Sequence, residues 1–153
     1  MRLVIQRVRE ASVSVNDQLV ASIGRGFLVL CGVAATDTAD DAAWAAQKTA
    51  RLRVFDDADG KMNLGLDSVG GEALVVSQFT LFGDCRKGNR PSYIDAAGPE
   101  QGEALYQAYV EALRGQGVKV RTGVFRAMMQ VALVNDGPVT LLVDSTQRGN
   151  GGA

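Results

Sequence analysis

The stretch NDGPVT, residues 135–140, interrupts an otherwise apolar run, with MMQVALV (128–134) before it and LLVDS (141–145) after it. This pattern predicts a hairpin-like pair of strands joined by a tight turn. A proline between two strands removes a ladder hydrogen bond, however, and an Asn-Asp-Gly turn does not need one. Pro138 is therefore either part of a plain turn or has a task of its own, and the sequence leaves both readings open.

A second stretch, SQFTLFG (77–83), continues the apolar segment EALVV (72–76), and we expect a strand across residues 72–84. In a regular strand Gln78 and Thr80 point the same way, within a segment that otherwise looks buried. Buried polar side chains need hydrogen-bond partners. They are either bonded across the sheet, which composition alone favours, or form a polar floor for a ligand.

The remaining strands are expected mainly in the first third of the chain. Alternation predicts strands over residues 3–8, 11–15 and 19–24, with a turn at Asn16 and Asp17. The continuous apolar run GFLVLCGVA (26–34) is typical of a strand buried on both faces. A short strand is expected at VKVRTG (118–123).

Two helices are predicted. Thr38 and Asp41 resemble a capping box, and the buried stripe of that helix is expected at Ala39, Ala43, Ala46 and Ala50. Pro99 opens a second helix, which ends at Gly115 or Gly117. Its buried stripe is expected at Leu105, Ala108, Tyr109 and Ala112.

These elements predict an α+β fold in a single domain, with a largely antiparallel, barrel-like sheet and two main helices. The chain has 153 residues, which suits one domain. We expect the domain to span residues 1–145. The small, polar segment TQRGNGGA (146–153) is expected to be a disordered tail.

Composition excludes several classes of site. The chain has no histidine, which removes histidine-based triads and metal sites. It has two cysteines, and Cys31 is expected to be buried, whereas Cys85 is expected in a polar loop. DDADGKMN (56–63) has the wrong spacing for a calcium loop, so we interpret it as a turn. No signal peptide or membrane span is recognised, and we expect a cytoplasmic protein.

The two opening motifs together resemble the D-aminoacyl-tRNA deacylases. SQFTLFG fits the pattern Ser-Gln-x-Thr-Leu-x-Gly, and NDGPVT fits Asn-x-Gly-Pro-x-Thr. The resemblance covers roughly residues 1–145 and includes QRV (6–8), SVSV (12–15), KGNRPSY (87–93) and TGVF (122–125). It implies a homodimeric enzyme that needs no cofactor or metal and hydrolyses the ester between a D-amino acid and the terminal adenosine of tRNA. Whether glycyl-tRNA mischarged on tRNA-Ala is also cleaved stays open.

The resemblance also implies roles for particular residues. The catalytic site would be lined by Ser77, Gln78, Phe79 and Thr80. Gly137 and Pro138 would form a cis dipeptide that reaches into the partner protomer's site, and Arg7 would hold it. Phe125 and Met129 would lie beside the adenosine.

Two mechanisms remain open at this point. Because no residue is an evident base, the 2′-hydroxyl of the substrate can activate the attacking water, with backbone N–H groups near Phe79 and Thr80 stabilising the oxyanion. Thr80 as a covalent nucleophile is the competing mechanism. In either case a main-chain wedge at Gly137–Pro138 would admit the D form, whereas the side chain of the L form would collide with the backbone.

The net charge of −1 argues against bulk electrostatic capture of nucleic acid, and DNA is not expected as a partner. We expect local tRNA contacts from Arg86, Lys87 and Arg90, with Lys119 and Arg121 as further candidates. For each of these the alternative is a solvated surface charge.

Three residues depart from the resemblance. It leads us to expect a small residue in place of Arg126, an acidic or polar one in place of Met128, and Phe in place of Tyr93. Two alternatives to an enzyme also remain: a non-catalytic module of the same fold that binds a nucleotide or aminoacyl group, and a dimeric structural protein.

Overall fold

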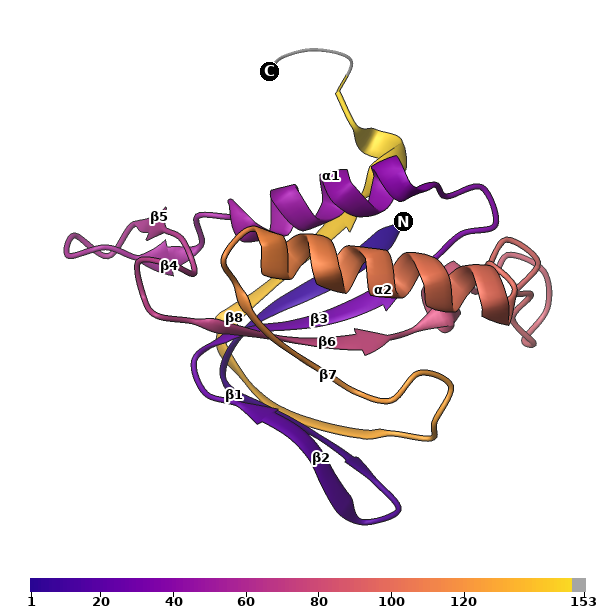
Figure 1. The fold of residues 1–153 in the computed structure, drawn as a ribbon, viewed down its shortest axis with the longest axis horizontal. Helices are drawn as coiled ribbons and strands as arrows, with labels where there is room; N and C mark the ends of the chain where they lie inside the picture. The colour runs from indigo at the N-terminus through magenta and orange to yellow at the C-terminus, as the bar shows by residue number, and fades with distance from the viewer. Residues whose placement is uncertain (150–153) are drawn as a thin grey trace.

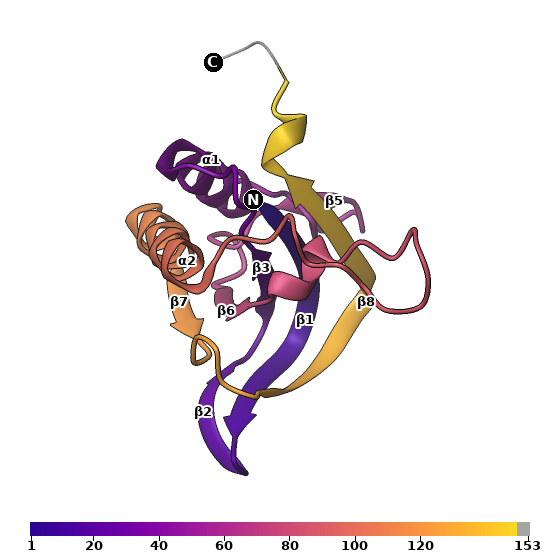
Figure 2. The same cartoon turned by 90° about the vertical axis from the view of Figure 1, so that its right-hand side faces the viewer.

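A computed structural model describes residues 1–149, and its main sheet curls into an incomplete barrel with two helices packed on one face (Figures 1 and 2). The expected barrel-like α+β domain is therefore confirmed. The elements in chain order are β1 (Arg2–Val15), β2 (Gln18–Ile23), β3 (Gly26–Gly32), α1 (Ala39–Ala50), β4 (Phe55–Asp56), β5 (Met62–Leu64), β6 (Glu72–Ser77), the 3₁₀ helix η1 (Phe79–Phe82), α2 (Pro99–Gly115), β7 (Lys119–Thr122), β8 (Gln130–Asp144) and the 3₁₀ helix η2 (Ser145–Gln147).

The sheet is mixed, so the prediction of a largely antiparallel sheet was wrong. β1 pairs antiparallel with β2, β3 and β8, but β3 and β6 are parallel, and so are β6 and β7. The reason lies in the connections. α1 lies between β3 and β6, and α2 lies between β6 and β7, so each helix returns the chain to the same end of the sheet.

The parallel pair β3–β6 begins with a close approach of two backbones. A Cβ added at Gly26 would lie 1.8 Å from the carbonyl oxygen of Glu72, the residue that pairs with it. No side chain fits into that space, so Gly26 is required for the two strands to start in register.

The first two strands form the predicted hairpin. Asn16 and Asp17 connect β1 to β2, and both have positive φ, 49° and 60°. Two consecutive left-handed residues are the geometry of a type I′ turn, for which Asn and Asp are suited. The predicted strands at 3–8 and 11–15 are parts of the single long strand β1.

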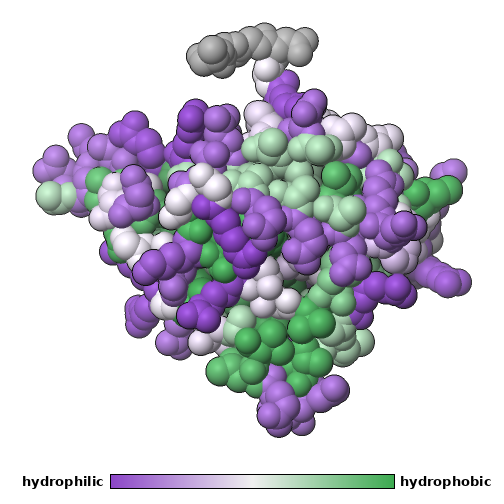
Figure 3. Space-filling model, viewed as in Figure 1, coloured by the Kyte–Doolittle hydropathy of each residue, from purple (hydrophilic) through white to green (hydrophobic). Residues whose placement is uncertain are grey.

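Alternate residues of the central strands enter two separate cores, as their apolar composition predicted. On β6, Ala73 and Val75 pack in the core beneath the helices, whereas Leu74 and Val76 pack in the core inside the curve of the sheet. Full burial of one such aliphatic side chain contributes about 1.5–3 kcal/mol. On the face of the molecule seen in Figure 3, hydrophobic surface gathers over the lower strands, away from the helices.

Helix α1 begins with the predicted capping box, formed by Thr38 and Asp41. Its predicted buried face was largely wrong. Of the four expected alanines only Ala46 is fully buried, and the buried residues of α1 are Asp41, Ala42, Ala45, Ala46 and Thr49. Alanine is compatible with either face of a helix, so the spacing of alanines did not indicate which face of α1 is buried. Thr49 can be buried because its hydroxyl bonds the carbonyl of Ala45 at 2.8 Å and the hydroxyl of Tyr109 at 3.0 Å.

Helix α2 begins at Pro99 and ends at Gly115, as predicted. Tyr109 is fully buried, but the other three residues of the expected stripe are only partly buried. The buried residues of α2 are Gly102, Tyr106, Tyr109, Val110 and Leu113.

The predicted hairpin at residues 128–145 was wrong, because both flanks of NDGPVT belong to one strand, β8. Asn135 pairs with Val8 and Thr140 with Gln6, so both flanks run antiparallel to β1 in the same direction. Residues 136–139 leave the ladder opposite Arg7 and form a bulged tip. The peptide bond between Gly137 and Pro138 is cis.

The side chain of Asn135 spans the base of this tip. Its amide oxygen accepts from the Val139 amide at 2.8 Å, and its amide nitrogen donates to the Thr140 hydroxyl at 3.1 Å. The Asn and Thr of the motif therefore hold the two ends of the tip together, and Gly137 and Pro138 are left exposed at its apex.

The end of β8 packs beside the start of β1. The N-terminal ammonium of Met1 pairs with the buried Asp37 and donates to the Ser145 hydroxyl at 2.6 Å. Thr146 and Gln147, the first residues of the expected tail, form part of η2. Residues 150–153 of that tail lie outside the described part of the chain.

Candidate active site

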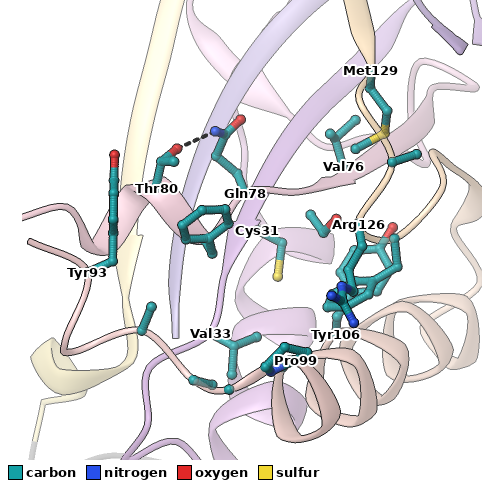
Figure 4. A pocket seen from close by; sticks show the side chains of 18 of the residues that line it. Cys31, Val33, Val76, Gln78, Thr80, Tyr93, Pro99, Tyr106, Arg126 and Met129 are labelled. Atoms are coloured by element: carbon teal, nitrogen blue, oxygen red, sulfur yellow. Dashed lines mark hydrogen bonds between the residues drawn. The ribbon is translucent and has the colours of Figure 1, made fainter. Parts of the chain in front are cut away.

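A cavity of about 810 Å³ opens where β3 and β6 end, and α2 begins at its border (Figure 4). It contains six of the predicted site residues: Ser77, Gln78, Phe79, Thr80, Phe125 and Met129. The sequence did not assign several other lining residues to the site, chiefly Cys31, Val76, Ala97, Tyr106, Ala127 and Val131. Their positions depend on the strand pairing, for example of Cys31 with Ser77, which one sequence does not reveal.

The strand predicted across residues 72–84 ends at Ser77, and the chain then turns into η1. The amide of Gln78 still donates to the carbonyl of Cys31 at 2.8 Å, which fixes the start of the turn on β3. The next amide with a backbone acceptor is that of Leu81, bonded to the carbonyl of Gln78 at 3.2 Å. Within the described residues the N–H groups of Phe79 and Thr80 have no acceptor, as is usual for the first residues of a helix.

Gln78 and Thr80 contact each other, so the prediction that they point the same way is confirmed, although a turn and not a strand brings them together. The side-chain amide of Gln78 donates a hydrogen bond to the Thr80 hydroxyl oxygen (Figure 4). Because this oxygen is the acceptor, the Thr80 proton stays available for a ligand. Gln78 is neutral and cannot act as a base toward Thr80.

Aromatic residues border the cavity on two sides. Phe79 is 58% exposed, and its ring meets that of Tyr93 edge-on, with centroids 5.1 Å apart. On the other side Tyr106 and Phe125 have centroids 5.7 Å apart, and the Tyr106 hydroxyl donates to the Val75 carbonyl at 3.0 Å. Phe79 and the partly buried Phe125 provide apolar faces on which a base or an aromatic side chain can stack, whereas Tyr106 is buried behind Phe125.

Cys31 lies at the floor of this cavity and is buried, as predicted. Burial raises the pKa of its thiol to about 12, with the nearby N-terminal ammonium opposing and Asp37 adding to the shift. The thiol therefore stays protonated at neutral pH, which is unsuited to nucleophilic attack.

Met129 contacts the backbone of the preceding loop. A Cβ added at Gly123 would lie 2.6 Å from the Met129 sulfur, so the glycine makes room for this side chain. Met128, by contrast, is 88% exposed.

Arg7, Gly137 and Pro138 do not line the cavity with the other predicted residues. Arg7 is buried against the tip of β8, where its Nε donates to the Asp136 carbonyl at 2.8 Å. Gly137 and Pro138 are exposed. Within one protomer the tip and the cavity are thus separate features.

The basic residues lie on exposed segments. Arg86, Lys87 and Arg90 belong to the loop after η1, and Lys119 and Arg121 lie on β7, apart from that loop in both views (Figures 1 and 2). Arg86 pairs with Asp84 at 2.7 Å, and this contact lowers the pKa of Asp84 to about 2. Lys87 and Arg90 have no such ion pair within the described residues.

Within residues 1–149 no group of three or more Cys, Asp or Glu side chains is arranged to hold a metal ion. None of the helices in this part of the chain is long and apolar enough to cross a membrane.

Comparison with known proteins identifies the family. The family model described as D-Tyr-tRNA(Tyr) deacylase matches residues 4–144. A protein of Thermotoga petrophila named D-aminoacyl-tRNA deacylase is 57% identical over 96% of this chain and 99% of its own length. A protein of Anaeromyxobacter dehalogenans with the same name is 60% identical over 95% of this chain and 97% of its own length.

Solved structures agree on the fold. One titled c-Myc DNA Unwinding Element Binding Protein has a TM-score of 0.87 and 39% identity, covering 94% of this chain and 98% of its own. A probable eukaryotic D-amino acid tRNA deacylase has a TM-score of 0.80 at 19% identity, covering 93% and 97%, which supports the fold alone. The chain belongs to the D-Tyr-tRNA(Tyr) deacylase family.

Proposed function

We propose that this protein hydrolyses the ester bond of D-aminoacyl-tRNA and releases the D-amino acid and the tRNA. The observation that carries the proposal is the turn at Ser77–Thr80, whose residues line a cavity together with Phe125 and Met129 and whose Phe79 and Thr80 N–H groups have no acceptor among the described residues. Relatives that are 57–60% identical to this chain have that activity in their names.

The unpaired amides of Phe79 and Thr80 suit the oxyanion. When water attacks the ester carbonyl, negative charge develops on the carbonyl oxygen, and two fixed N–H donors stabilise it without reorganising. Collapse of the tetrahedral intermediate breaks the bond to the ribose oxygen, which takes up a proton and leaves with the tRNA. Loss of one such donor typically costs about 2.7–4 kcal/mol of activation free energy.

The base is proposed to come from the substrate. Arg126 is the charged residue of the cavity lining within the described chain, and a guanidinium does not accept a proton. The vicinal 2′-hydroxyl of the terminal ribose can instead orient and activate the attacking water. Thr80 then serves as a donor that positions the ester group and not as a nucleophile. No cofactor takes part in this mechanism.

Selection for the D form is proposed to occur between two protomers. The tip at Gly137–Pro138 is exposed and does not line the cavity of its own chain. In a homodimer it would enter the partner's cavity, where main-chain carbonyls accept from the ammonium of a D substrate and collide with the side chain of an L substrate. Exposed apolar residues on β8, Val134 and Leu142, support self-association along this strand.

Lys87 and Arg90 are proposed as tRNA contacts, and Arg86 as a weaker one, because Asp84 already neutralises its charge. The activity proposed here places the protein in the cytoplasm, where aminoacyl-tRNA is used. Glycyl-tRNA mischarged on tRNA-Ala is a second candidate substrate, since glycine has no side chain to meet the tip.

The activity is tested by incubating the purified protein with D-Tyr-tRNA and L-Tyr-tRNA and following loss of the ester. We expect cleavage of the D form alone. Protection of both esters, or no effect on either, would instead identify a binding module of the same fold.

Contribution of the tip in trans is tested by mixing two inactive variants. Gly137→Ala places a Cβ 3.0 Å from the Arg7 guanidinium and disturbs the tip, whereas Gln78→Ala disturbs the cavity. Dimers that contain one chain of each kind have one intact site if the tip acts on the partner, so activity should return on mixing. No recovery, despite subunit exchange seen by native mass spectrometry, would place the tip and the cavity in the same chain.

A further inference from the structure

The cavity has one charged residue in its lining within the described chain, Arg126. Arg126 is exposed, and no ion pair or side-chain hydrogen bond between described residues involves it. An arginine at the border of an otherwise neutral cavity, without a partner among residues 1–149, is available to an anionic group of a ligand.

The backbone at Arg126 is also unusual. Its φ is +66°, in the left-handed region that non-glycine residues rarely adopt. Among the residues that the structure describes, the other non-glycine residues with positive φ are Asn16 and Asp17, which suit the hairpin turn that they form. Arg126 is the third residue of a turn closed by the hydrogen bond from the Ala127 amide to the Val124 carbonyl at 3.2 Å, and this position requires a positive φ that glycine or asparagine adopts more easily. An arginine is an unfavourable residue for it, and outliers of this kind gather at functional sites.

Figure 4 places Arg126 on the side of the cavity with Tyr106 and Pro99, whereas Gln78 and Thr80 lie on the opposite side. Arg126 directly follows Phe125, which is expected beside the adenosine. The cation is therefore separated from the proposed site of ester cleavage and adjacent to the proposed site of the nucleoside. Pro99 is the first residue of α2, and the positive end of that helix dipole adds to the same field.

We propose that Arg126 binds the 5′-phosphate of the terminal nucleotide and so positions the substrate for hydrolysis. This inference rests on the proposed function, which supplies an aminoacylated nucleotide as the ligand. The planar guanidinium can donate two parallel hydrogen bonds to phosphate oxygens, a geometry that an ammonium cannot reproduce. Arg126 would then act as a positioning residue that distinguishes a nucleotide from a nucleoside.

The test compares equilibrium binding of adenosine 5′-monophosphate and adenosine by calorimetry, with the unmodified protein and with Arg126→Ala, Arg126→Gly and Arg126→Lys. We expect the unmodified protein to bind the monophosphate at least about tenfold more tightly than adenosine, as a charge-assisted hydrogen bond allows. Arg126→Ala and Arg126→Gly should reduce the ratio of the affinity for the monophosphate to that for adenosine to near one, without changing the affinity for adenosine. Arg126→Lys should keep part of the preference for the monophosphate.

Two controls separate binding from folding. Glycine adopts positive φ without cost, so Arg126→Gly removes the guanidinium while relaxing the backbone. Arg9→Ala removes an exposed arginine of β1 that lies outside the cavity lining, and it should leave the ratio unchanged. With D-Tyr-tRNA, Arg126→Gly should raise KM and leave kcat nearly unchanged.

Equal affinities of the unmodified protein for the two ligands would overturn the proposal, and so would an equal loss of both affinities in Arg126→Gly. A protein that prefers the monophosphate through Arg126 but cleaves no ester would keep this inference and reject the proposed hydrolysis. The two ideas therefore fail separately.

Discussion

Arg7 holds the tip of β8 through the backbone of Asp136, whose carbonyl oxygen accepts from the Arg7 Nε at 2.8 Å. The same guanidinium donates from Nη1 to the carbonyl of Val54 at 2.7 Å. The Arg7 side chain is 9% exposed. The buried guanidinium of Arg7 thus connects the tip, residues 136–139, to the chain just before β4. These hydrogen bonds hold the tip where β1 makes no ladder hydrogen bonds to it.

Replacing Arg7 should loosen the tip. Arg7→Ala leaves two carbonyls without their charged donor, and each such bond contributes about 1.5–3 kcal/mol. We expect a lower melting temperature, slower hydrolysis of D-Tyr-tRNA and weaker rejection of L-Tyr-tRNA. Arg9→Ala is the matched control, because Arg9 lies on the same strand but is exposed. If Arg7→Ala lowers stability while both rates and the D over L ratio stay unchanged, Arg7 has no part in the site.

The amide of Phe79 can be tested with a pair of substitutions. Phe79 is the first residue of η1, where proline is tolerated because the N–H has no helical acceptor. Phe79→Ala removes the ring alone, and Phe79→Pro removes both the ring and the N–H. If this amide stabilises the oxyanion, kcat of the proline variant should be about 10²–10³-fold lower than kcat of the alanine variant. Equal kcat values in two variants that melt alike would remove the Phe79 amide from the mechanism.

Local signals in the sequence predicted the elements with short-range causes. The type I′ turn needed only Asn16 and Asp17, and the start of α1 needed only Thr38 and Asp41. The pairing of Gln78 with Thr80 followed from two polar residues in an apolar segment. These features depend on neighbours in the chain, so one sequence is enough to predict them.

Long-range features were predicted less well. Parallel pairing of β3 with β6 depends on the path of α1, and the single strand β8 depends on β1 pairing with both of its flanks. The fragment NDGPVT by itself fits a hairpin as well as a bulge. Arg126 lines the cavity because its backbone has a positive φ. Arginine rarely adopts that conformation, so the residue type gave no reason to predict it.

The two mechanisms left open by the sequence predict opposite results for two changes. If the substrate supplies the base, Thr80→Ala removes one hydrogen bond and should lower kcat about tenfold. A D-aminoacyl-tRNA ending in 2′-deoxyadenosine should then be almost inert with the unmodified protein. Single-turnover hydrolysis measures both. Near-complete loss in Thr80→Ala, with normal cleavage of the 2′-deoxy substrate, would support Thr80 as the nucleophile.

Binding of tRNA should depend weakly on salt, because few cations are proposed to contact it. Lys87→Ala and Arg90→Ala should each reduce the slope of log K against log salt by about 0.7–0.9, the value for one phosphate contact. Arg86→Ala should change it less, since Arg86 is already paired with Asp84. Filter binding between low and moderate salt gives the slopes. An unchanged slope in a variant lacking both Lys87 and Arg90 would remove this loop from the tRNA interface.

The two cysteines should differ in reactivity. Cys85 is exposed, whereas Cys31 is buried at the floor of the cavity with a pKa raised by burial to about 12. A thiol reacts as the thiolate, so iodoacetamide at pH 8 should add one group to the native protein, on Cys85, and a second on Cys31 only in urea. Peptide mass spectrometry locates the adducts.

Because the proposed mechanism uses neither thiol, hydrolysis of D-Tyr-tRNA should survive modification of Cys85. The control variant Cys85→Ala should not react with iodoacetamide while it is folded. The contrary result would be an adduct on Cys31 in folded Cys85→Ala that forms at the same rate as activity is lost. It would show that the reagent reaches the floor of the cavity and that the Cys31 thiol ionises there, and the mechanism would then have to include Cys31.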